Sequence, residues 1–148
     1  MSIWGPLPVE NDDAADWLSE FSEEPSISGL VDVFDEVASV DSEEYIEIPE
    51  CSVAVAAATI VRDLFKSERS EYFFDNAWST LQALFAKLTP TARINLIRKA
   101  LKSINVVMLE SERSELFQVI QDSPFHKIWL ENMKKLGNDL EEIKKSLK

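Results

Sequence analysis

The sequence of 148 residues contains a single cysteine, a single histidine and only three glycines. Because Cys51 has no second cysteine to pair with, no intrachain disulfide can form, and nothing indicates an oxidising compartment. Residues 1–16 carry acidic side chains where a signal peptide requires a basic start and an apolar stretch. The longest apolar run, residues 53–61, is too short to span a bilayer. The sequence therefore predicts a cytoplasmic protein that does not insert into membranes.

Lysine and arginine are absent from the first 61 residues, which nevertheless hold fifteen of the 27 acidic residues. All 15 basic residues follow from Arg62 onward, so the formal net charge of −12 originates in the first part of the chain. A charge asymmetry of this kind reports on partners more than on fold. Because contacts to phosphate require clustered lysine and arginine, residues 1–61 disfavour nucleic acid as a partner.

The remaining composition, with 45% hydrophobic residues and six prolines, is that of an ordinary globular protein. A chain of this length predicts one domain spanning residues 1–148. Apolar residues recur at spacings of three and four, as in amphipathic helices, so we expect an all-α, single-domain bundle of five to seven helices. The expected helices start near Asn11, Gly29, Pro49, Phe74, Pro90, Glu112 and Ser123.

Two places leave the local structure open. Residues 45–48 precede Pro49, and the residue before a proline avoids the helical conformation, so a short extended segment or a loop is expected there. Gly137 lies within the last expected helix, where a glycine costs about 1 kcal/mol relative to alanine. It marks either a tolerated interior glycine or a break in that helix.

Carboxylate-rich stretches are the natural candidates for metal sites. Asp12, Asp13 and Asp16 match the D-D-x-x-D pattern of terpenoid synthases, but the chain shows no second acidic site and no large cavity, so helix capping explains them better. Residues 41–52 fail as a calcium loop, because Ile46 stands at the glycine position and Ser52 at the position of the bidentate glutamate. We expect no metal and no cofactor.

Side chains with catalytic potential are few. His126 has no second histidine with which to build a zinc site, and a packed or solvated role is expected for it. Cys51, near a helix start, is either a reactive thiol or a small buried hydrophobe, and the lack of a basic neighbour favours the second. Carboxylates alone do not reveal the paired groups of acid–base catalysis, so we do not expect an enzyme.

One expected helix in the second part of the chain carries a cationic face. We expect this face to be a solvated surface. The alternative is that its positive charge docks the acidic half of the same molecule. The face comprises Arg93, Arg98, Lys99 and Lys102.

Three blocks of the sequence carry a family resemblance. Trp4-Gly5, Pro8 and residues 11–17 (NDDAADW) resemble the opening W-G-x-G-P-F-D-N-D-x-A-x-D-[FW] of an uncharacterised bacterial family of unknown function, with departures at Leu7, Val9 and Glu10. Residues 45–50 (YIEIPE), followed by an alanine-rich stretch, are similar to the second block of that family, and Ser114-Glu115-Leu116 to the third. The resemblance implies a small helical bacterial protein and brings no reaction or cofactor with it.

The acidic half suggests a protein that binds a basic partner. The most concrete hypothesis is an immunity protein that neutralises a basic toxin such as a nuclease, because a nuclease presents lysine and arginine to phosphates. The alternative is a regulatory or scaffold domain without a toxin partner, and a monomer or weak homodimer is expected in either case. We expect the contact surface to be formed by Asp32, Asp35, Glu36, Asp41, Glu43 and Glu44.

Overall fold

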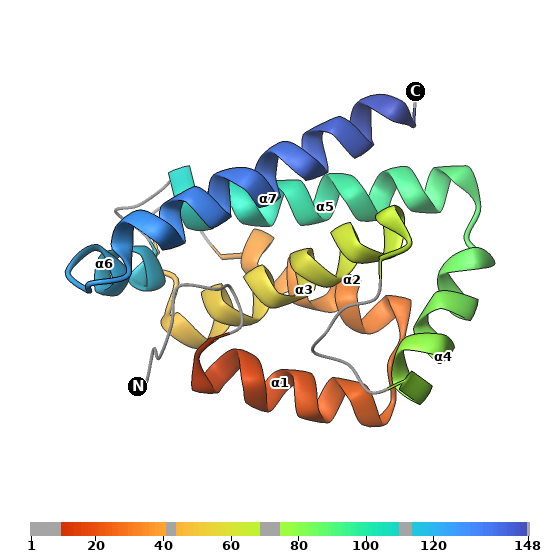
Figure 1. Cartoon of the computed structure of the whole chain (residues 1–148), viewed down its shortest axis with the longest axis horizontal. Helices are drawn as coiled ribbons and strands as arrows, with labels where there is room; N and C mark the ends of the chain where they lie inside the picture. The colour runs from red at the N-terminus through yellow and green to blue at the C-terminus, as the bar shows by residue number, and fades with distance from the viewer. Residues whose placement is uncertain (1–9, 41–43, 69–74, 110–113, 148) are drawn as a thin grey trace.

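A computed structural model describes residues 10–40, 44–68, 75–109 and 114–147 of the chain. Seven α-helices carry these residues, and no strand is named among them, as the all-α prediction requires (Figure 1). The helices are α1 (Asp12–Glu23), α2 (Ile27–Ala38), α3 (Ile48–Lys66), α4 (Asp75–Ala86), α5 (Pro90–Leu109), α6 (Glu115–Gln121) and α7 (His126–Ser146).

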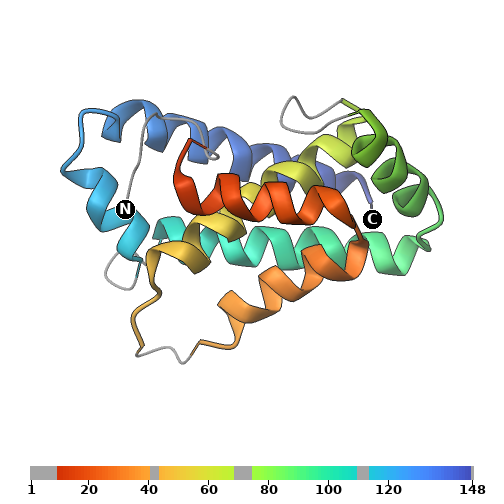
Figure 2. The same cartoon turned by 90° about the horizontal axis from the view of Figure 1, so that it is seen from below.

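The centre of the bundle is α3, which contacts α1, α2, α5, α6 and α7. Figure 1 shows α1 below α3, α2 behind it, and α5 and α7 above it, and Figure 2 shows the same helices from below. Residues 54–61 of α3 are all buried, and four of them are alanines. Small side chains let neighbouring helices approach from every direction, so this helix has no solvated face over those residues and serves as the axis of the core.

Capping side chains fix where several helices begin. The Asn11 side chain accepts a hydrogen bond from the amide of Ala14 at 2.9 Å, and the Thr89 hydroxyl accepts one from Ala92 at 3.1 Å, as the sequence predicts. The second helix begins at Ile27 and not at Gly29, because Ser26 provides the cap by accepting from the Gly29 amide at 2.9 Å. Gly137 does not break α7, which continues to Ser146.

Residues 44–47 connect α2 to α3 and cross to the start of α6. Ile46 forms an isolated parallel bridge with Ser114, and the Glu115 amide donates to the Ile46 carbonyl at 3.0 Å. The short extended segment expected near residues 45–48 is therefore present as one bridge. It places the entrance of α3 beside α6.

The seven described helices include none with the length and apolar character that a bilayer crossing demands.

Candidate functional site

The predicted acidic contact residues fall on two neighbouring segments. Asp32, Asp35 and Glu36 lie on α2 at positions i, i+3 and i+4, so they share one face of that helix, and all three are exposed. Glu44, also exposed, follows α2 in the connection to α3. Two further predicted contacts, at positions 41 and 43, lie outside the described residues.

Asp35 does not present a free charge, because Lys99 of α5 forms an ion pair with its carboxylate. For Lys99, this ion pair confirms the alternative prediction, that the cationic face docks the acidic half of the same molecule. Arg93, another of those residues, lies over the ring of Phe85, with its guanidinium carbon 4.5 Å from the ring centroid. The exposed negative charge of α2 is therefore concentrated on Asp32 and Glu36.

A groove opens between α1, the last turns of α2 and the start of α3. It has an apolar hollow of about 200 Å³ and, beside it, a more polar hollow of about 460 Å³. Glu36 and Glu50 line both hollows. The apolar hollow is completed by Trp17, Val33, Val37, Pro49 and Val53. The polar hollow is completed by Ser39, Val40, Glu44, Tyr45, Ile46 and Glu47. We call the two hollows together the acidic groove.

Glu47 and Glu50 are functional candidates that sequence reasoning missed. Glu47 is the residue that precedes α3, and Glu50 lies in its first turn beside Pro49. The chain reverses direction between α2 and α3 (Figure 2), and Glu36 of α2 and Glu50 of α3 line the same two hollows. The proline at the start of α3 is visible in the sequence and indicates where this helix begins. The groove itself could not be predicted from the sequence, because it is formed by the tertiary packing of α1, α2 and α3.

The formal charges that line the acidic groove are of one sign. Of the described residues that line it, four are glutamates and none is a lysine or an arginine. Two helix ends meet at the groove: the carboxyl end of α2, with its negative partial charge and no basic side chain in its last turn, and the amino end of α3, with its positive partial charge beside Glu47 and Glu50. Glu50 Oε2 is buried from solvent and has no hydrogen-bond partner among the described residues. A buried carboxylate oxygen without a partner is costly, so a donor that entered the groove would be bound favourably.

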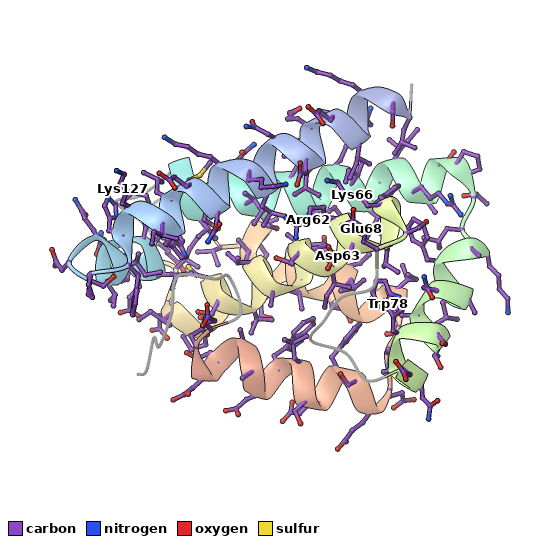
Figure 3. All side chains as sticks on the ribbon, in the orientation of Figure 1. Arg62, Asp63, Lys66, Glu68, Trp78 and Lys127 are labelled. Carbon is purple, nitrogen blue, oxygen red and sulfur yellow. The ribbon has the colours of Figure 1, made fainter. Side chains whose placement is uncertain are left out.

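The opposite end of α3 carries the compensating charges. Figure 3 shows Arg62, Asp63 and Lys66 on the last turns of this helix. Asp139 of α7 accepts ion pairs from three cations through Oδ2: Lys135 at 3.0 Å, Lys66 at 3.4 Å and Arg62 at 3.6 Å. At a rise of about 1.5 Å per residue, Glu50 and Lys66 are about 24 Å apart along the helix. The glutamates at the start of α3 and this ion-pair cluster at its end are thus separated along the helix.

Residues that carried the family resemblance make structural contacts. The Glu115 carboxylate accepts a hydrogen bond from the Ile48 amide at 2.9 Å, and Tyr45 donates one to Gln118. The second and third blocks of the resemblance are therefore in contact. Ile48 and Glu115, which form the hydrogen bond between them, are 67 positions apart in the sequence. Asn11 of the first block is buried and caps α1. The contacts of the described residues in these blocks are structural, and Trp4, Gly5 and Pro8 of the first block lie outside the described residues.

Cys51 is packed within this contact and is buried. Its sulfur lies 3.5 Å from the Ile46 carbonyl oxygen and 3.6 Å from the Ser114 hydroxyl. Burial raises the pKa of the Cys51 thiol above its usual 9.0, although the hydrogen bond with Ser114 acts in the opposite direction. A thiol with a raised pKa is a poor nucleophile at neutral pH, so the side chain behaves as a small buried hydrophobe.

Metal-ligating side chains do not converge in the part of the chain that the structure describes: no group of three or more His, Cys, Asp and Glu residues is placed to hold an ion. Asp12 and Asp13 occupy the first turn of α1, where they complement the helix dipole. His126 begins α7 and packs edge-on against Phe117, with 6.1 Å between the ring centroids.

Comparison with known proteins gives a family and no activity. A family model described as a domain of unknown function matches residues 2–132. No curated protein and no solved structure matches the chain.

Proposed function

The chain belongs to this family, DUF4259, and we propose that it is a bacterial immunity protein that binds and inhibits a basic toxin such as a nuclease. In this proposal the protein acts in the cytoplasm, performs no catalysis and requires no cofactor. It occupies the surface with which the toxin would otherwise contact nucleic acid.

The observation that carries the proposal is the acidic groove together with Asp32 of α2. Asp32, Glu36 and Glu47 are exposed carboxylates on adjoining elements, and Glu36 and Glu47 line a groove that has no described lysine or arginine in its lining. A nuclease requires clustered lysine and arginine to hold phosphates, and a protein with the opposite potential gains both association rate and specificity from that field.

Capture of partners from the native host tests the proposal with two variants of equal charge. The acidic-face variant carries D32K, E36K and E47K. The distal variant carries E23K, E131K and E142K, which change exposed residues of α1 and α7. The proposal expects wild type and the distal variant to capture a basic toxin and to protect cells that express it, while the acidic-face variant does neither.

Two other results discriminate between the candidate functions. Capture of a partner without toxic activity through the same residues would favour the alternative, a regulatory or scaffold domain. Equal capture and protection by both charge-reversed variants would show that the acidic residues are only solvated, and the immunity proposal would fail.

A further inference from the structure

The apolar hollow of the acidic groove is a surface that the described chain leaves uncovered. Trp17 forms one wall and stacks on Phe21, with 4.7 Å between the ring centroids. Val33 and Val37 of α2 and Val53 of α3 contribute the remaining apolar surface. With a volume of about 200 Å³, the hollow is below the range of roughly 300–1,000 Å³ typical of small-molecule sites. It is large enough for an apolar side chain.

The carboxylates lie directly at the edge of this hollow. Glu36 and Glu50 belong to the lining of both hollows, so any group that reaches from one hollow to the other passes them. Glu44 and Glu47 extend the negative charge along the polar hollow. The apolar surface and the negative charge therefore adjoin each other. A ligand that fits both needs an apolar group beside a positively charged group.

We propose that the acidic groove holds a basic amphipathic segment of the partner protein. One apolar side chain of that segment fills the hollow between Trp17 and Val53, and a neighbouring arginine donates to the carboxylates of Glu36 and Glu50. Arginine suits this edge because its planar guanidinium bonds carboxylate oxygens in pairs and is weakly hydrated. The segment supplies the donor that Glu50 Oε2 lacks.

The two halves of the site exclude simpler occupants. A cation alone would leave the apolar hollow exposed to water, and the described residues offer no three-ligand group to coordinate it. A purely apolar ligand would cover the groove and leave the carboxylates desolvated without a donor, which costs free energy. A segment with an apolar side chain and an adjacent arginine fills the hollow and also donates hydrogen bonds to the carboxylates at its edge.

The proposal rests on the proposed function, and a peptide titration of the full chain tests it separately. The probe is the acetylated, amidated peptide RSLRSLR, added to isotope-labelled protein while NMR spectra are recorded. The control peptides are RSSRSSR, which keeps the charge and lacks the apolar side chains, and ESLESLE, which keeps the apolar side chains and reverses the charge. We expect saturable shifts of the Trp17 indole and the Val33, Val37 and Val53 methyl signals with RSLRSLR only.

Two independent variants and one matched control accompany the titration. E36Q/E50Q removes both charges with little change of shape, and we expect it to weaken binding at least about tenfold. V53F fills the hollow without changing any charge and should weaken binding similarly. E131Q/E142Q removes the same charge from exposed residues of α7 and should leave the affinity for RSLRSLR unchanged.

The outcomes separate the groove from the wider acidic surface. Binding of RSLRSLR that survives V53F, or shifts that gather around Asp32 instead of Trp17, would overturn the groove as the docking site and leave the proposed function standing. Equal binding of RSSRSSR would also overturn it, because charge alone would then suffice. Loss of partner capture in the acidic-face variant, combined with full capture by E36Q/E50Q and V53F, would overturn the groove as the docking site of the native partner.

Discussion

The carboxylate of Glu115, at the start of α6, accepts a hydrogen bond from the backbone amide of Ile48, the first residue of α3, with 2.9 Å between Oε1 and N. The first amides of a helix have no partner within the helix, and Glu47, which precedes α3, makes no capping hydrogen bond with its side chain. A residue from a distant part of the sequence therefore caps α3, and this contact sets the position of the acidic groove relative to α6.

Replacing Glu115 with alanine should lower the free energy of unfolding by about 1–2 kcal/mol, because the part-buried Ile48 amide loses its acceptor. Urea denaturation followed by far-ultraviolet circular dichroism measures the change. E142A, at an exposed position of α7, serves as the control and should change the stability by less than about 0.5 kcal/mol. A Glu115 variant as stable as that control would show that water replaces the lost acceptor at no cost.

Asp139 should make the stability depend on pH. Partial burial raises the pKa of this carboxyl group, but the hydrogen bond and charge of Lys135 and the charge of Lys66 together hold it below its usual 3.8. A depressed pKa in the folded state stabilises the fold fully above the unfolded-state value of 3.8, and this contribution is lost as the pH falls through the folded value.

The variant D139N isolates that contribution. At pH 7 it should be less stable than wild type by about 1 kcal/mol or less, the range of partly exposed ion pairs. The difference should shrink as the pH falls below 3.8 in parallel urea titrations of both proteins. A difference that stays constant down to about pH 2 would show that Asp139 acts through packing and not through its charge.

The two described glycines within helices should respond in opposite ways to alanine. A Cβ at Gly137 would meet no atom within 4 Å, so G137A should stabilise the protein by about 1 kcal/mol through helix propensity. A Cβ at Gly29 would lie 2.9 Å from the Ser26 hydroxyl and 3.0 Å from the Phe21 ring, so G29A should destabilise it. Thermal melts of both variants measure the effects, and destabilisation by G137A would contradict this packing.

Local signals in the sequence predict most of the fold. Asn11, Thr89 and the two prolines Pro49 and Pro90 act through neighbouring residues, so the starts of their helices can be inferred from the sequence. The start predicted for the second helix is two residues late, because the apolar spacing does not reveal that Ser26 is the cap. Periodicity locates the apolar face of a helix more reliably than its ends.

The candidate site could be predicted only in part. The shared face of Asp32, Asp35 and Glu36 follows from helical spacing alone. Neither the pairing of Asp35 with Lys99 nor the contribution of Glu50 follows from spacing, because each depends on how distant helices pack. The charge asymmetry of the sequence indicated the sign of the surface, and the fold determined which carboxylates shape it.

The most direct test of the central claim is the rate at which the captured basic partner associates with the protein as ionic strength rises. Stopped-flow fluorescence would measure this rate from about 0.02 M to 0.5 M salt for wild type, the acidic-face variant and the distal variant. If the acidic groove and Asp32 attract the partner, association of wild type and the distal variant is fast at low salt and slows steeply as salt rises, while the acidic-face variant is slow throughout. Equal rates and equal salt dependence for the two charge-reversed variants would contradict the claim.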